Sequence, residues 1–208
     1  MTPGNPEKER LIKGLMAQGY LKTKKVISVF EKVPREEFVL ENDRDIAYVD
    51  YPLSILSGQT ISAPHMVAIM TELLETGPKD KVLEIGAGSG YQAAILSKLV
   101  RKVYSIEVDP ELVSFAGSNL RRAKIKNVEV IRGDGSKGYE KAKPYDKIIV
   151  TCATPEIFDS WIKQLKTDGI ILAPVGGGFH QELIKLRKSK KGIEKKNYGG
   201  CAFVPLRG

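Results

Sequence analysis

The chain has 208 residues, of which 42% are hydrophobic, and carries a formal net charge of +8. This length and composition predict one compact enzyme domain, and because no apolar run of about 18 residues and no secretory leader appears, we expect the protein to be soluble and intracellular. Cys152 and Cys201 lack the C-x-x-C spacing of zinc and redox sites, so we expect no metal, no disulfide framework and a cytoplasmic location.

The first part of the chain is predicted to form an N-terminal helical extension. Two short helices are expected over residues 6–18 and 23–32, because Thr23 is a suitable cap and Pro34 prevents the second helix from continuing. The irregular, turn-rich segment 34–62 follows. Pro64 then opens an amphipathic helix, since apolar residues recur after it at helical spacing.

The junction between this segment and the helix, SGQTISAPHMVA at residues 57–68, is a candidate ligand loop. Gln59, Thr60 and Ser62 stand just before a helix N-terminus, whose amides and dipole favour an anion such as a carboxylate. Helix capping is the alternative explanation for Ser62, because that residue lies near the capping position. Capping explains the whole polar set less well, and His65 is expected to contribute little to the site.

The run VLEIGAGSGYQ at residues 82–92 predicts a buried strand, a glycine turn and the start of a helix. Gly86, Gly88 and Gly90 permit backbone turns and close approach of a ligand. The dinucleotide pattern G-x-G-x-x-G would need glycine where Tyr91 stands, and no Gly-Lys-Ser/Thr ending of a phosphate loop follows. The remaining pattern, E-x-G-x-G-x-G with Glu84 at the strand end, is typical of methyltransferases that use S-adenosylmethionine.

Two further acids are predicted at the same edge of the sheet. Glu107 ends the strand expected over 102–107, about 20 residues past the glycines, where ribose hydroxyls are bound in folds of this class. Asp134, next to Gly135, follows the next strand and could accept a hydrogen bond from an adenine amino group. Each could be a plain surface acid, but their succession after the glycine turn favours a nucleoside site.

From residue 81 onward, strands and helices are predicted to alternate. This alternation favours a doubly wound α/β fold, Rossmann-like, with a mostly parallel sheet covered on both faces. Residues 181–188 and 200–206 are expected to close the sheet as a C-terminal antiparallel strand pair, and the lysine-rich run between them is interpreted as a solvated hairpin. The elements expected before that pair are strands 81–85, 102–107, 128–132, 145–151 and 169–174 and helices 90–100, 110–123 and 156–165.

Six segments together resemble the protein-L-isoaspartate O-methyltransferase family over roughly residues 10–206. They are GQTISAPHMVA, VLEIGAGSGY, GDGSKGY, YDKIIVTCATPEI, LKTDGIILAPVGG and GGCAFVPL. The resemblance implies transfer of a methyl group from S-adenosyl-L-methionine to the free carboxylate of L-isoaspartyl residues, and more weakly of D-aspartyl residues, in damaged proteins and peptides. The ester then closes to a succinimide, whose hydrolysis returns part of the population to aspartate.

The resemblance also implies roles for particular residues. Ser62 matches the active-site serine. The expected cofactor-binding residues are Thr60, Ser62, Glu84, Gly86, Gly88, Glu107, Asp134 and Gly135. The expected substrate-binding residues are Gln59, Thr60, Ser62, Cys201, Ala202 and Val204. One departure is that the chain stops at Gly208, where many relatives continue, which puts in doubt a longer tail that closes over the cofactor.

The same resemblance makes residues 1–208 a single methyltransferase domain. Its N-terminal helices and substrate and cofactor loop are assigned to 1–62, and its cofactor-binding core to 63–208. The order of the last sheet strands in the family is expected to differ from that of most methyltransferases. We expect a monomer without a specific nucleic-acid or membrane partner.

Two other functions are weighed against this one. A nucleic-acid methyltransferase, acting for example on tRNA, would suit the basic charge, but residues 151–155 read TCATP where amino-group methylation calls for Asn/Asp-Pro-Pro-Tyr/Phe. A non-catalytic RNA-binding protein would need stacking aromatics among the lysines, and residues 185–196 contain none.

The expected reaction requires no general base. An aspartyl-type carboxylate is already ionised at pH 7, so Ser62 is expected to orient its partner rather than act as a nucleophile.

Overall fold

A computed structural model describes residues 5–178 and 180–208, and it begins with a helical extension. The predicted helices are confirmed as α1 (Pro6–Ala17) and α2 (Lys24–Lys32). The side chain of Asn5 caps α1 by accepting hydrogen bonds from two main-chain amides. Thr23 stands at the cap position of α2, but its hydroxyl donates instead to Glu72 at 2.9 Å and so ties the extension to the core.

The segment between this extension and the core consists of short ordered pieces. They are the 3-10 turns η1 (Arg35–Glu37), η2 (Glu41–Ile46) and η3 (Leu56–Gly58) and the two short strands β1 (Leu53–Ser54) and β2 (Thr60–Ile61). The strands pair with each other in an antiparallel hairpin. Helix α3 (Pro64–Leu73) begins at the predicted proline. The candidate loop is therefore held between a small hairpin and a helix start.

The core is a seven-stranded sheet in the order β5-β4-β3-β6-β7-β8-β9. The first five strands in this order are parallel and the last two are antiparallel. The strands are β3 (Lys81–Ile85), β4 (Lys102–Glu107), β5 (Val128–Arg132), β6 (Tyr145–Val150), β7 (Leu165–Gly177), β8 (His180–Ser189) and β9 (Gly192–Cys201). The prediction of a doubly wound α/β fold is confirmed. At one side of the sheet, the last three strands, β7, β8 and β9, lie next to one another in the order in which they occur in the sequence.

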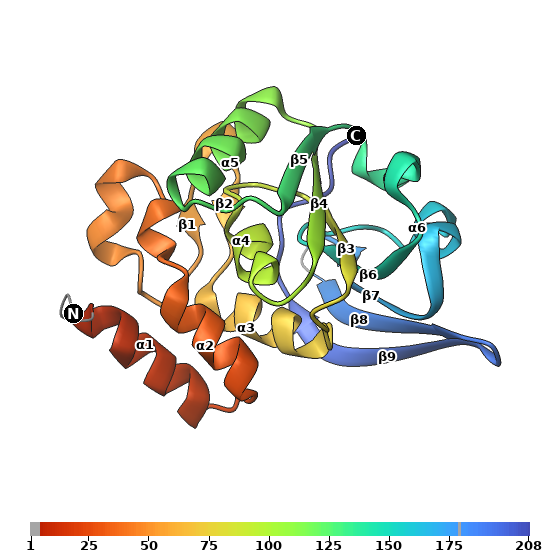
Figure 1. Ribbon diagram of the computed structural model, residues 1–208, viewed down its shortest axis with the longest axis horizontal. Coiled ribbons are helices and arrows are strands. Elements are labelled where there is room, and N and C mark those ends of the chain that lie inside the picture. Colours follow the sequence, from red (N-terminus) through yellow and green to blue (C-terminus); the bar gives the residue numbers. More distant parts are fainter. Residues whose placement is uncertain (1–4, 179) are drawn as a thin grey trace.

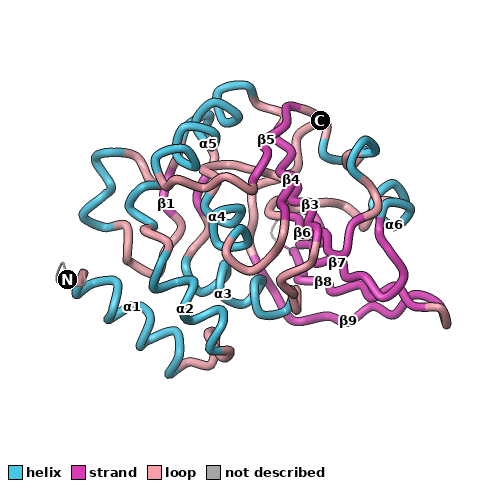
Figure 2. The backbone as a smooth tube through the Cα atoms, in the orientation of Figure 1, coloured by secondary structure: helices cyan, strands magenta, loops and turns pink. Residues whose placement is uncertain are grey.

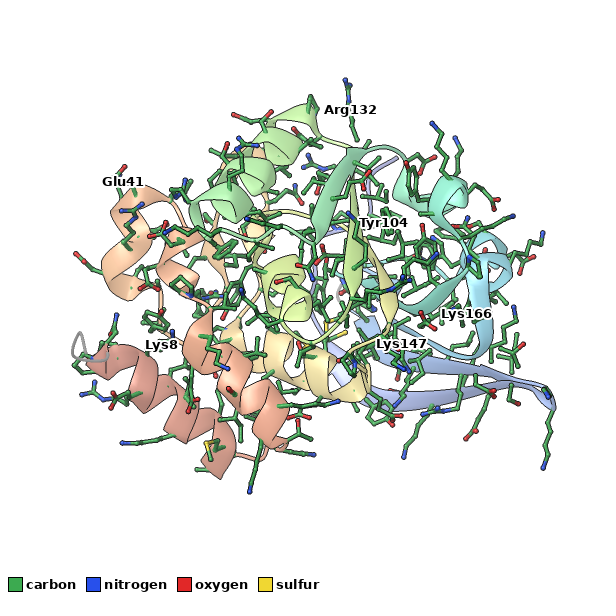
Figure 3. All side chains as sticks on the ribbon, viewed as in Figure 1. Lys8, Glu41, Tyr104, Arg132, Lys147 and Lys166 are labelled. Atoms are coloured by element: carbon green, nitrogen blue, oxygen red, sulfur yellow. The ribbon has the colours of Figure 1, made fainter. Side chains whose placement is uncertain are left out.

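Helices cover both faces of the sheet, because alternate residues of each buried strand point to opposite sides. Val82 packs in the core shared with α3, α4 (Tyr91–Ser97) and α5 (Pro110–Arg122), whereas Leu83 and Ile85 pack in the core shared with α6 (Asp159–Gln164). Figures 1 and 2 show α1 to α5 on one side of the strands and α6 on the other. Figure 3 labels Tyr104, which belongs to the core on the α6 side. Two further 3-10 turns, η4 (Gly135–Lys137) and η5 (Glu140–Ala142), connect β5 to β6.

The pairing predicted for the C-terminal strands was wrong in its second member. β8 pairs with β9 (Gly192–Cys201) through a two-residue turn at Lys190–Lys191, so only Gly200 and Cys201 of the predicted strand 200–206 belong to the pair. The predicted solvated hairpin is confirmed, because the lysine-rich run forms the exposed end of the β8–β9 hairpin, which projects from the molecule (Figure 1). Residues after Cys201 instead turn back across the sheet edge, where Ala153 donates to the carbonyl of Val204 at 2.8 Å.

The glycine turn, Glu107 and Asp134 all lie where parallel strands end. They stand at or just after the carboxyl ends of β3, β4 and β5, on the same side of the sheet. The register pairs Ile85 with Ile106 and with Val150, so three consecutive parallel strands end side by side. Ligands of doubly wound sheets bind outside this edge. None of the helices in residues 5–178 and 180–208 has the length and hydropathy of a membrane span.

Candidate functional site

The glycine turn between β3 and α4 has a conformation that other residues rarely adopt. Gly86, Gly88 and Gly90 have φ values of +92°, +52° and +86°. A Cβ on Gly86 would lie 2.8 Å from Oγ1 of Thr151, which itself donates to the carbonyl of Gly86 at 2.6 Å. The first glycine therefore allows the turn to pack closely on the end of β6, and the turn forms the floor of a cavity.

Glu107 is one of two acids that line this cavity, the other being Asp109. One carboxylate oxygen accepts a 3.0 Å hydrogen bond from the amide of Gly88, and the other accepts from the amides of Val108 and Asp109. These donors fix the orientation of the carboxylate, which is 8% exposed and lines the cavity. Its remaining lone pairs can accept from hydroxyl groups of a bound ligand.

This first cavity brings together most of the predicted cofactor residues. Its wall includes Thr60, Ser62, Gly86, Gly88, Glu107 and Gly135. Gly135 is needed there for another reason, because an added Cβ would lie 2.5 Å from the side chain of Ile85. Apolar side chains such as Ile106 and Leu112 complete the wall. The cavity thus combines fixed polar groups with an apolar surface, as expected of a nucleoside site.

Two predicted cofactor residues, Glu84 and Asp134, lie outside this lining. Glu84 is fully buried, accepts a hydrogen bond from Ser105 on β4 and has a second oxygen without a partner. Burial raises the pKa of Glu84 to about 8. Asp134 accepts from the amide and hydroxyl of Ser136 and pairs with Lys137, and these hydrogen bonds lower its pKa. Neither acid therefore lines the cavity: Glu84 is buried beneath the sheet surface, and Asp134 is partly exposed and engaged by its own neighbours.

The polar loop before α3 is not explained by helix capping. Ala63 occupies the cap position of α3 and no side chain caps the helix, so the hydroxyl of Ser62 is not used for that purpose. Gln59, Thr60 and Ser62 all line the first cavity. The main-chain carbonyl of Ser62 accepts a 2.9 Å hydrogen bond from Nη2 of Arg35. The capping alternative therefore does not account for Ser62.

A second cavity lies beside the first and contains most of the predicted substrate residues. Cys201, Ala202 and Val204 form one part of its wall, and Thr60 and Ser62 form another. The two histidines of the chain, His65 and His180, also line it, and His65 bonds to Asp50 through both its main-chain amide and its ring nitrogen Nδ1. Gln59 is the one predicted substrate residue that lines the first cavity and not the second.

The two cavities share a wall of four residues, namely Thr60, Ser62, Thr151 and Val204. Groups bound in the two cavities would therefore be neighbours that both lie against these four residues. Cys152 also faces the first cavity, but burial keeps its pKa well above 9, so it is a neutral thiol at pH 7 and no nucleophile. Among the described residues, no cluster of His, Cys, Asp or Glu could hold a metal ion.

Thr151 and the segment from Val204 to Arg207 were not predicted to face the first cavity. Thr151 follows β6, so its place at the carboxyl end of a central strand is a sequence signal that could have identified it. The segment carries no such signal. It reaches the cavity because Val204 and Leu206 both hydrogen-bond to Ala153, and Nη2 of Arg207 lies 3.4 Å from the carbonyl of Ser57.

Comparison with known proteins gives concordant matches. The model of the protein-L-isoaspartate(D-aspartate) O-methyltransferase family matches residues 6–208. A protein-L-isoaspartate O-methyltransferase of Methanopyrus kandleri is 50% identical over 206 residues, which cover 97% of this chain and 91% of the relative.

Two solved structures share the fold over nearly the whole chain. One is a protein-L-isoaspartate O-methyltransferase, 28% identical with a TM-score of 0.88, where the match covers 97% of this chain and 66% of that one. The other is a protein-L-isoaspartate O-methyltransferase of Plasmodium falciparum in complex with S-adenosyl-L-homocysteine. It is 26% identical with a TM-score of 0.85, and the match covers 98% of this chain and 99% of that one.

Proposed function

The chain belongs to the protein-L-isoaspartate(D-aspartate) O-methyltransferase family, and from this premise we propose how its residues perform the reaction. The protein transfers a methyl group from S-adenosyl-L-methionine to the free carboxylate of L-isoaspartyl residues in damaged proteins and peptides. The observation that supports the residue assignment is the wall shared by the two cavities, with Ser62 in it. The cofactor occupies the first cavity and the isoaspartyl segment the second.

The first cavity fits the cofactor. Its glycine turn leaves room for close approach of a ligand, and Glu107 presents an oriented carboxylate suited to ribose hydroxyls. When bound there, S-adenosylmethionine supplies an electrophilic methyl group on a positively charged sulfur. Gly86, Gly88, Glu107 and Gly135 hold the cofactor, while Glu84 joins β3 to β4 through Ser105 and Asp134 fixes the turn that carries Gly135 through Ser136.

The second cavity fits an extended peptide. The main chain of residues 201–204 leaves the sheet there, and the amide and carbonyl of Phe203 are both bonded to the side chain of Gln181. Phe203 is thus tied to β8, and it lines the cavity together with its neighbours Ala202 and Val204, which lie beside the substrate main chain. Thr60 and Ser62 meet the isoaspartyl carboxylate at the shared wall.

The reaction requires positioning more than acid–base chemistry. An aspartyl-type carboxyl group has an unperturbed pKa of about 4, so the attacking oxygen is already ionised at pH 7. Ser62 donates a hydrogen bond that orients this oxygen, and the adjoining cavities place the oxygen next to the methyl group, so that the new O–C bond forms as the S–C bond breaks. The hydroxyl of Thr151 is engaged by the carbonyls of Ile85 and Gly86, so it shapes the wall rather than binding substrate.

Two synthetic peptides that differ only in an aspartyl or isoaspartyl linkage test the function. We expect base-labile methyl ester to form on the isoaspartyl peptide and little on its twin, when methyl transfer from labelled S-adenosylmethionine is measured. Equal esterification of both peptides would contradict isoaspartyl repair. Labelling of tRNA in place of either peptide would favour the nucleic-acid alternative, which the family match does not support.

We further infer that residues 1–208 act as one methyltransferase domain, that the enzyme is a monomer and that it works in the cytoplasm. The extension and core share one hydrophobic cluster, which supports a single domain. Both cavities are formed within one chain, which supports a monomer, and the two free thiols suit a reducing compartment. Light scattering of the purified protein tests the monomer, which a mass of twice 23.0 kDa would contradict.

A further inference from the structure

Arg35 is a fully buried cation that hydrogen-bonds to the main chain of the loop that carries Ser62. It stands at the start of η1, and its residue exposure is 0%. Its Nη2 donates to the carbonyl of Ser62 at 2.9 Å, and its Nε donates to the carbonyl of Ala47 at 2.9 Å. The planar guanidinium therefore joins the end of η2 to the residue that lies in the wall between the two cavities.

The same guanidinium also contacts the cofactor side of the site. Its central carbon lies 4.9 Å from the ring centre of Tyr91, in cation–π geometry. Tyr91 is the first residue of α4, follows directly on the glycine turn and lines the first cavity. Arg35 thus lies between the loop that carries Ser62 and the helix that begins at the cofactor turn.

Packing alone does not require an arginine at this place. Among the described residues, no carboxylate pairs with Arg35, and Nη1 is buried without a partner. Asp50 acts on the cation electrostatically but is bonded to His65. An apolar side chain of similar volume would fill the space without the cost of burying a charge. What such a side chain could not do is donate to the carbonyl of Ser62 while stacking on Tyr91.

We propose that Arg35 is a positioning residue for methyl transfer, which holds the Ser62 loop in register with the start of α4. This inference rests on the proposed orienting role of Ser62. Because Arg35 touches neither cavity, it acts on the rate through the geometry of Ser62 and leaves ligand affinity nearly unchanged. Arg35 therefore sets how well the carboxylate oxygen is aligned, not how tightly substrate or cofactor binds.

A double-mutant cycle with Ser62→Ala tests the proposal. We expect Arg35→Lys and Arg35→Met to lower kcat about tenfold in the wild-type background, with KM for the isoaspartyl peptide and Kd for S-adenosylmethionine changed less than about twofold. In the Ser62→Ala background, the same changes should alter kcat less than about twofold, because the group that they position is absent.

Tyr48→Phe is the matched control. The Tyr48 hydroxyl accepts from the main-chain amide of Arg35 and donates to Glu36, so this variant perturbs the same buried cluster without touching the contact to Ser62. We expect a lower melting temperature and a nearly unchanged kcat. The lysine variant keeps the charge and most of the volume, and so remains informative where the methionine variant does not fold.

Each other outcome overturns the proposal in a recognisable way. Equal losses of kcat in both backgrounds, or a rise in KM or Kd with kcat unchanged, would make Arg35 a general structural residue. Failure of both Arg35 variants to fold would give the same result. A Ser62→Ala enzyme with wild-type kcat would refute the role of Ser62 itself. Isoaspartyl specificity is measured separately with the peptide pair and does not depend on the cycle.

Discussion

The amide of Gly88 donates a 3.0 Å hydrogen bond to the carboxylate of Glu107, so one side chain joins the glycine turn after β3 to the end of β4. The two residues are 19 positions apart, and the parallel pairing of β3 with β4 brings them together. The bond gives the acid two functions, because the carboxylate that fixes the turn also faces the cofactor cavity. Loss of Glu107 should therefore affect cofactor binding in two ways.

Glu107→Ala should weaken S-adenosylmethionine binding by about 2 kcal/mol, or roughly 30-fold in Kd, since hydrogen bonds to charged groups contribute about 1.5 to 3 kcal/mol. Isothermal titration calorimetry measures this directly. Glu129→Ala is the matched control, because Glu129 is an acid on the neighbouring strand β5 that pairs with Lys102 outside the cavity. Equal affinity of the Glu107→Ala and wild-type enzymes would show that this acid does not bind the cofactor.

Ser62→Ala should slow methyl transfer by a factor of roughly 10 to 100, the contribution of one or two hydrogen bonds, and leave cofactor affinity nearly unchanged. Single-turnover kinetics with the isoaspartyl peptide measure the rate. A covalent role would instead reduce the rate to background, and the wild-type enzyme would gain one methyl group on the Ser62 peptide when given cofactor without substrate. Intact-mass spectrometry detects such a gain, which would refute direct transfer.

Gly86→Ala should lower the free energy of unfolding by at least about 2 kcal/mol. Part of the loss comes from a φ of +92°, which is unfavourable for an L-residue by about 1 to 2 kcal/mol, and part from a Cβ only 2.8 Å from Oγ1 of Thr151. Urea denaturation measures the change. Gly177→Ala serves as the control because nothing lies within 4 Å of the added Cβ there. A variant at Gly86 as stable as that control would contradict the close packing.

Glu84 should make the enzyme less stable as the pH rises from 6 to 9. Burial raises the folded-state pKa of Glu84 to about 8, above its unfolded value, so the folded state binds this proton more tightly. The resulting stabilisation is complete below the unfolded pKa and is lost as the pH rises through the folded one. Between the unfolded and the folded pKa, each rise of one pH unit removes about 1.4 kcal/mol of this stabilisation, and the loss levels off above the folded pKa.

Glu84→Gln tests this linkage, because glutamine keeps the shape and removes the titration. Thermal unfolding at pH 6, 7.5 and 9 should show a smaller decline in melting temperature for the variant than for the wild type. Ser105 can still donate to the amide oxygen, so the variant should fold. Parallel pH profiles for the two proteins would place the titration elsewhere.

The strand pattern and the cofactor motifs could be predicted closely because they depend on local features. The strands at 81–85, 102–107 and 128–132 begin and end where expected, since each is a short apolar run bounded by turn residues. Helix α4 is shorter than predicted, ending at Ser97 rather than 100, and β7 is longer, extending to Gly177. Helix and strand ends depend on tertiary hydrogen bonds, as the pairing of β7 with β8 shows.

The sequence by itself determined the chemistry of the first cavity, because glycines and acids at strand ends follow from the rules of a parallel sheet. It also contained the motifs of the family. Tertiary structure alone decided which acids face the cavity, since Glu84 and Glu107 both lie near strand ends but only Glu107 lines it. Tertiary structure likewise brought Arg35 to the carbonyl of Ser62, 27 residues away, because the segment that carries η1 packs against the loop before α3 and the start of α4.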